Sequence, residues 1–157
     1  MTNVDFFRAF AADVSTKAEA YYFEHSREDF ANLYDADSAA DTQIKMFHYT
    51  DPRGINVVTN ESGAVEDVEY NGEILMLIKS DIDEVIDGQK GQDYDQGKYE
   101  GRVKALIENG GLIAEILAYN NCNTNYEIEF SGLSEIYNMF DFNADGIHFR
   151  YKITIPA

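Results

Sequence analysis

The sequence offers one short run whose residue types and spacing suit a divalent cation. Asp141, Asn143 and Asp145 place three oxygen-bearing side chains at alternate positions, and Gly146 follows them. This pattern matches the first half of an EF-hand calcium loop, where the oxygens bind the ion and the glycine allows a sharp turn. The twelfth position of such a loop needs a bidentate glutamate, but here it is Lys152. We therefore favour a turn before a strand over a calcium site, and we expect no metal and no cofactor.

The histidines and the single cysteine are the other side chains suited to metal binding or nucleophilic attack. His25, His48 and His148 lie far apart in the sequence and form no zinc-type cluster. We expect His48 and His148 to be solvated residues on the polar faces of strands, with the alternative that the two strands bring them together. Cys122 has no histidine or basic residue beside it, so we interpret it as structurally neutral rather than as a reactive thiol.

Sequence motifs for catalysis and for phosphate binding are absent. The chain contains no G-x-S-x-G, S-x-x-K, G-x-x-x-x-G-K or G-x-G-x-x-G pattern. Acidic pairs such as Glu127 and Glu129 are frequent because the whole chain is acidic, and they indicate no acid–base site by themselves. We therefore expect that this protein is not an enzyme.

The negative charge of the chain argues against several classes of partner. The 157 residues include 29 Asp and Glu against 12 Lys and Arg, which gives a net charge of −17. Duplex DNA and anionic membranes attract proteins through Lys and Arg side chains, so we expect no specific DNA binding and no membrane partner. With 45% hydrophobic residues, the chain can form a core and need not be disordered.

Length and cysteine content bear on domain organisation and compartment. The length suits a single domain over residues 1–157. A lone cysteine permits no disulfide within the chain, and no apolar run is long enough to span a bilayer. The N-terminal residues lack the pattern of a signal peptide, so we expect a soluble protein made in the cytoplasm.

Two stretches have the apolar spacing of amphipathic helices, residues 3–24 and residues 98–119. The pair Gly110-Gly111 lies inside the second stretch, so either packing overrides the low helix propensity of glycine or the helix breaks there. The predicted apolar stripe of the second helix includes Val103, Leu106, Ile107, Ile113, Ala114 and Leu117.

Alternating apolar residues and turn signals predict strands between and after the helices. The expected strands are residues 44–49, 55–59, 64–70, 73–79, 126–130 and 146–155. The expected turns are Asp51–Gly54, Asn60–Gly63 and Asn71–Gly72, of which the last is the strongest hairpin signal. In the last strand one face consists of Ile147, Phe149, Tyr151, Ile153 and Ile155.

This order of elements predicts the fold class. We expect an α+β domain with a mostly antiparallel sheet, an N-terminal helix and a second long helix packed on the sheet. Residues 25–41 are predicted to form an acidic loop, and a mobile loop is predicted at about residues 87–98, where glycine and aspartate dominate.

Aromatic residues near the N-terminus are candidates for contacts with another subunit. The first helix has apolar residues on more than one side, and tyrosine is enriched at interfaces. The predicted interaction residues are Phe6, Phe10, Tyr21, Tyr22 and Phe23. Packing of these aromatic residues in the core of the same chain is the alternative.

The complete order of elements resembles the tail-terminator and tail-completion (head-tail connector) family of bacteriophages. The resemblance rests on Val4–Tyr22 as a first helix, Ile44–Tyr49 closed by Asp51-Pro52, Tyr70–Leu75 as a strand entry, Tyr99–Leu117 as a crossing helix, and Asn125–Phe130 with Gly146–Ile155 as closing strands.

The resemblance implies a virion structural protein that is assembled in the host cytoplasm. Copies would form a homo-oligomeric ring at the neck or tail, connect the portal or head to the tail, and contact other neck or tail proteins. DNA would pass through the ring as cargo, and an acidic lumen would keep it from sticking.

A different class of function explains the charge as well. A small acidic immunity or inhibitor protein would neutralise a basic toxin or nuclease, with electrostatic attraction speeding their association. Most of the acidic surplus lies in the first half of the chain and in its loops, while residues 98–122 hold equal numbers of acids and bases. The acidity is therefore a property of the surface, and the sequence leaves both functions open.

Overall fold

The computed structural model describes residues 1–18, 21–25, 44–79, 103–139 and 144–157. The helices are α1 (Asn3–Ala18), the short α4 (Lys104–Ile107) and α5 (Gly111–Asn123), with a 3₁₀ turn at Glu108–Gly110 between the last two. The strands are β1 (Tyr21–His25), β2 (Ile44–Thr59), β3 (Val65–Lys79), β4 (Glu127–Met139) and β5 (Ala144–Pro156).

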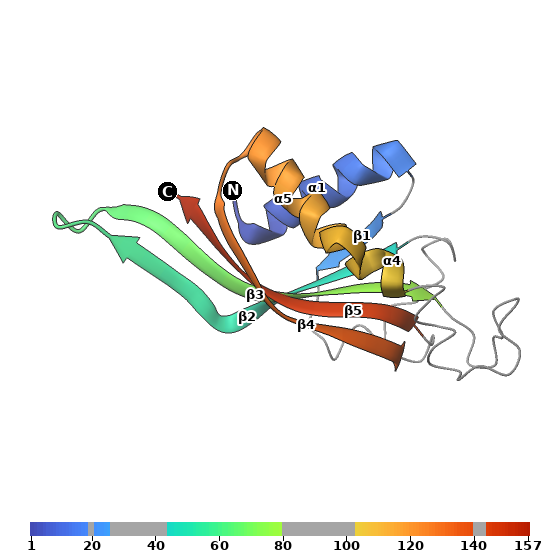
Figure 1. Cartoon of the computed structure of the whole chain (residues 1–157). Helices are drawn as coiled ribbons and strands as arrows, with labels where there is room; N and C mark the ends of the chain where they lie inside the picture. The colour runs from blue at the N-terminus through green and yellow to red at the C-terminus, as the bar shows by residue number, and fades with distance from the viewer. Residues whose placement is uncertain (19–20, 26–43, 80–102, 140–143) are drawn as a thin grey trace, which may run out of the picture.

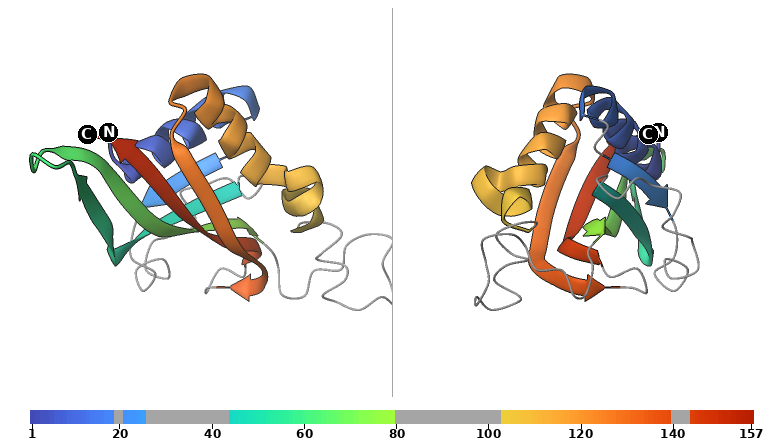
Figure 2. Two further views of the ribbon diagram at one scale, coloured as in Figure 1. Left: turned by 60° about the vertical axis from the view of Figure 1, so that its left-hand side comes forward. Right: turned by 90° about the vertical axis from the view of Figure 1, so that its right-hand side faces the viewer.

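The strands form one sheet in the order β1-β2-β3-β5-β4. β1 pairs parallel with β2, and the other neighbouring strands pair antiparallel. The helices α1 and α5 lie together on one side of the sheet, which we call the helix-covered face (Figures 1 and 2). This arrangement confirms the predicted α+β class with a mostly antiparallel sheet.

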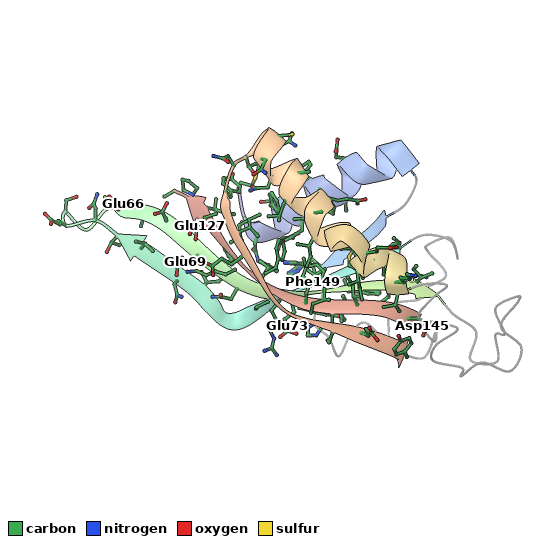
Figure 3. All side chains as sticks on the ribbon, viewed as in Figure 1. Glu66, Glu69, Glu73, Glu127, Asp145 and Phe149 are labelled. Carbon is green, nitrogen blue, oxygen red and sulfur yellow. The ribbon has the colours of Figure 1, made fainter. Side chains whose placement is uncertain are left out.

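The main core lies between the helices and the sheet. Its buried side chains alternate along β5, as the sequence predicts, with Phe149 on the helix-covered face and Arg150 on the opposite face (Figure 3). Its large side chains that are fully buried are Phe6, Phe7, Phe10, Met46, Ile74, Met76, Ile116, Ile147 and Phe149, and Tyr151 joins them with 3% exposed. A smaller cluster on the opposite face consists of Phe47, Leu75, Leu77 and Ala144. The centre of β3 is therefore buried on both faces.

The first helix is shorter than its apolar spacing predicts. A capping box begins it, in which the Thr2 hydroxyl accepts from the Asp5 amide and the Asp5 carboxylate accepts from the Thr2 amide. These hydrogen bonds to Thr2 lower the pKa of Asp5. The helix ends at Ala18, and Tyr21–His25 forms β1 instead of a last helical turn. Pairing with β2, together with the strand propensity of aromatic residues, outweighs the helical spacing here.

The predicted turn at Asp51–Gly54 does not reverse the chain. β2 continues through it, and the register with β3 jumps from Thr50↔Gly72 to Ile55↔Tyr70, so β2 holds three extra residues. Pro52 has no amide hydrogen to give to a strand ladder, and a bulge is a place where a strand tolerates it. A hydrogen bond from the Asn71 side chain to the Gly54 carbonyl closes the bulge. The prediction of a turn was therefore wrong, and the signal marks a bulge.

The hairpin reverses at Asn60–Gly63, as predicted, and not at Asn71-Gly72. The Asn60 side chain accepts hydrogen bonds from the amides of Ser62 and Ala64, and Gly63 has a φ of 81°. Gly72 instead lies inside β3 opposite Tyr151. A side chain at this position would contact the Tyr151 hydroxyl and the Tyr49 carbonyl, so close approach of Tyr151 explains the glycine.

The second predicted helix breaks at its glycine pair. Gly110 has a φ of 78° and Gly111 a φ of 42°, and α5 starts there as a separate helix. Its buried side is therefore not the side that one continuous helix would bury. The buried residues of α5 are therefore Leu112, Ile116 and Asn120, whereas the predicted Ala114 and Leu117 are exposed. Of the two alternatives that the sequence left open, the break is correct. β4 is also longer than expected, because residues 131–139 extend it.

Several predicted segments lie outside the described residues. They include most of the acidic loop at 25–41, the mobile loop at about 87–98, and Asp141 and Asn143 of the calcium-like turn.

Replacing Gly72 tests whether close packing of Tyr151 fixes the sheet. Gly72→Ala should lower the free energy of unfolding by about 1–3 kcal/mol, the usual cost of overpacking. The control is Gly63→Ala, where the new side chain meets no atom within 4 Å and only the left-handed backbone costs roughly 1 kcal/mol. Urea unfolding of both variants measures the difference, and a Gly72→Ala variant as stable as the wild type would contradict the packing argument.

Candidate functional site

The predicted interaction residues fall into two groups in the structure. Phe6 and Phe10 are buried, with 1% and 0% of their surface exposed, because they belong to the main core between the helices and the sheet. Both rings contact Tyr119 of α5 edge-on, with centroids 5.7 and 5.6 Å apart. For these two residues the alternative, core packing within the chain, is correct, and neither ring is accessible to a partner.

The remaining three candidates lie in β1 rather than on a helix. Phe23 is half-buried against the main core, and the Arg8 guanidinium lies 5.8 Å from the centre of its ring. Tyr21 and Tyr22 pair with Ile44 and Lys45 of β2, and their side chains lie outside the described set. The structure therefore does not bring the five predicted residues together as one surface.

A buried chain of polar side chains joins the N-terminal helix to the centre of the sheet. The Asn3 amide donates to the Tyr151 hydroxyl over 2.7 Å, and that hydroxyl lies 2.5 Å from Nε2 of His48. A hydroxyl can both donate and accept, so Tyr151 is hydrogen-bonded to Asn3 and to His48 whichever nitrogen of His48 carries the proton. Nδ1 of His48 lies 2.8 Å from Nδ1 of His25, which is also 3.1 Å from the His48 carbonyl oxygen. Every member of the chain is thereby hydrogen-bonded.

Burial holds His48 and Tyr151 in their neutral forms. Loss of hydration, and secondarily the nearby charges of His25 and Arg8, lowers the pKa of His48 from 6.5 to about 3. Burial also raises the pKa of Tyr151 well above its ordinary value. The prediction that His48 is a solvated strand residue was therefore wrong. The sequence held a signal for it, because His48 continues the alternation of Ile44 and Met46 toward the helix-covered face.

The opposite face of the sheet carries paired charges around a shallow groove of about 510 Å³. Glu73 accepts from Arg150 and from His148, each over 3.0 Å, and Lys152 lies 2.8 Å from Glu69. The hydrogen bond from Lys152 lowers the pKa of Glu69. Because these charges already compensate one another, the groove favours no particular charged ligand.

The calcium-like turn gives no candidate metal site in the part of the chain that is described. Asp145 is buried at the start of β5 and pairs with Ile78 across the ladder. Within the described ranges, no group of three or more His, Cys, Asp or Glu side chains is placed to hold a metal ion. Cys122 is exposed on α5.

The strongest candidate for an interaction surface is the end of the β2–β3 hairpin, which projects past the helices (Figure 1). We call residues 55–67 the hairpin arm. Its exposed apolar side chains are Ile55, Val57, Val58 and Val65, with exposed fractions of 52%, 57%, 37% and 47%. β1 pairs only with residues 44–48 of β2, so no described strand covers the outer edge of Ile55–Thr59. The arm thus presents apolar side chains and an open strand edge together.

The sequence predicted the strands of the arm but not its projection. The signal that could have indicated it is the stretch 55–59, in which three of five side chains are apolar and none is charged. In a strand with one solvated face, polar and apolar residues would alternate strictly, and Val57-Val58 breaks that alternation.

Comparisons with known proteins leave the family of the chain open. No protein-family model matches the sequence, and neither does any curated protein to which it was compared. Among the helices of the described residues, none has both the length and the apolar character needed to cross a membrane.

The neutral His48 makes stability depend on pH. In the unfolded chain His48 takes up a proton below about pH 6.5, whereas the folded chain resists protonation down to about pH 3. This contribution to stability is therefore fully present above pH 6.5 and falls, at up to ~1.4 kcal/mol per pH unit, as the pH drops toward 3. Urea unfolding at pH 7.5, 6.0 and 5.0 should reveal the loss.

Two variants separate His48 from the other titrating groups. His48→Gln should unfold more easily at pH 7.5 but show a smaller further loss on acidification. His148→Gln, which removes a half-buried histidine on the opposite face, is the matched control for the loss of a histidine. Equal slopes in all three proteins would contradict the role assigned to His48.

Proposed function

We propose that this chain is a structural subunit that forms a homo-oligomeric ring through its hairpin arm, in the role of a bacteriophage head-tail connector or tail terminator. In that role the ring joins the portal or head to the tail within the virion and contacts other neck or tail proteins. The observation that carries the proposal is the open, apolar edge of the hairpin arm. The order of elements that suggested the family from the sequence is consistent with it.

The position of the exposed residues supports an assembly function. Monomeric proteins seldom expose neighbouring large apolar side chains, and such groups usually mark contact sites. Ile55 and Val57 continue the helix-covered face of the sheet beyond the helices, because their partners Tyr70 and Val68 pair onward with Ile153 and Ile155 of the core. A neighbouring subunit would bury them in the same way that the helices bury the rest of that face.

The charge of the chain supports passage of DNA without binding. The net charge is −17, and an acidic lumen repels phosphate, so DNA would slide past such a ring. In a gel-shift assay at moderate salt, the purified protein should leave duplex DNA unshifted at micromolar concentration. A retarded band that disappears as salt is raised would instead indicate electrostatic DNA binding and would count against this proposal.

Assembly is tested by multi-angle light scattering at several protein concentrations. The wild-type chain, with a subunit mass of 17.8 kDa, should give a multiple of that mass. Val57→Lys should dissociate the oligomer, since loss of a buried valine costs about 1.5 kcal/mol or more, a factor of ten in the dissociation constant.

Val65→Lys is the matched control for that substitution. It makes the same change in side chain on the same hairpin arm, but Val65 lies on β3 and not on the open edge. A wild-type chain that is monomeric at every concentration, and that binds one basic protein tightly, would overturn the ring and favour the acidic inhibitor. If Val65→Lys dissociates the oligomer as readily as Val57→Lys does, the open edge of β2 is not the contact between subunits.

A further inference from the structure

A ring of identical subunits needs two different surfaces on each copy, and, besides the outer edge of β1, the described part of the sheet has two open edges. Heterologous contacts, in which one surface of a copy meets another surface of the next, are those that close into rings. One open edge is Ile55–Thr59 of β2, described above. The other is the outer edge of β4, which ends the sheet order and has no further strand beside it among the described residues.

The β2 edge lacks the features that prevent strands from pairing. Native proteins protect open edges with charged side chains, proline or bulges. The five residues Ile55–Thr59 contain no charge and no proline, and Pro52 and Arg53 fall before them in the bulge. This stretch is therefore free to accept the backbone of another strand.

The β4 edge has a regular stretch of the same length. Glu127–Ser131 pairs in unbroken register with β5, and the register then shifts at Gly132, whose φ is 63°. Within it, Ile128 and Phe130 pack against the main core, while Glu127 and Glu129 are exposed on the opposite face. Each of the two edges thus has a stretch of five consecutive residues along which another strand could pair.

The faces and charges of the two edges match each other. Placed antiparallel beside β4, in the register that sets Val58 opposite Glu129, the β2 stretch would bring Val57 opposite Phe130 on the helix-covered face. On the opposite face, uncharged Val58 would lie next to Glu129, so the contact adds no like-charged pair. Pairing β4 with β4 would instead oppose Glu127 and Glu129 with their own copies, at a cost in stability.

We infer that the hairpin arm of one copy adds its β2 edge to the β4 edge of a second copy of this chain, which extends the sheet from subunit to subunit. Such strand addition draws affinity from backbone hydrogen bonds and specificity from the alternating side chains. The inference rests on the proposed function, because it names the partner and the contact by which the ring would close.

Disulfide trapping tests the contact directly. Paired strands bring opposite Cα atoms to about 4.5–5.5 Å, which is within the range that a disulfide spans. In a Cys122→Ser background, which removes the exposed native thiol, Val58→Cys and Glu129→Cys proteins are mixed and oxidised. The expected product is a disulfide-linked dimer of the two different proteins, and a chain with both substitutions should give a ladder of linked oligomers.

The control and the opposing outcomes are specific to the contact. Val65→Cys mixed with Glu129→Cys should link at least tenfold less than the Val58 pair. If Val58→Cys links to itself as readily as to Glu129→Cys, the arms pair with each other and the inference is overturned. If the wild type is oligomeric in light scattering but the mixed pair does not link, the inference falls and the proposed ring stands. If the wild type is monomeric at every concentration, the proposed function falls with it.

Hydrogen exchange on the wild-type chain provides a second measurement that needs no substitution. As the protein concentration rises from monomer to oligomer, the amides of Ile55–Thr59 and Glu127–Ser131 should slow together, by tenfold or more. Slowing confined to one of these two stretches would overturn the pairing of the arm with β4.

Discussion

The contact of Tyr151 with His48 and Gly72 is the constraint on which the rest of the structure depends. Its hydroxyl links Asn3 of α1 to His48 of β2, and its ring packs where β3 has no side chain. One residue of β5 therefore fixes the positions of a helix and two strands relative to one another. Because the linked groups are buried and neutral, any change that charges or removes one of them leaves the others without partners.

This rigid centre allows the hairpin arm to be exposed. Before the bulge β2 is flanked by both β1 and β3, whereas after it β3 is its one neighbour among the described strands. The three extra residues of the bulge separate these two parts of one strand. The core thus keeps its own packing complete, and the apolar side chains beyond the bulge are available for contacts outside the chain.

The sequence predicted the helices and strands more accurately than their first and last residues. It predicted the fold class more accurately than the residues of the interaction surface. Alternation placed the buried face of β5 correctly, because that pattern depends on a period of two in one strand. Local turn chemistry misled at Pro52 and at Gly72, where a bulge and a close tertiary contact require the same residue types as a turn. The burial of His48 and the crossing of α5 over Phe6 depend on partners more than 70 residues away, which local patterns do not contain.

Asn3 and Tyr151 are 148 positions apart in the sequence, and this separation affects the order in which contacts form during folding. A hairpin closes a short loop and so forms early, whereas a contact between the two ends of the chain must wait for the largest loss of chain entropy. During synthesis β5 leaves the ribosome after the other described strands, so the pocket of His48 stays incomplete until then. The edge of β2 exists before the core is sealed, and a nascent chain is competent to pair with a neighbour, or to aggregate, before its own fold is finished.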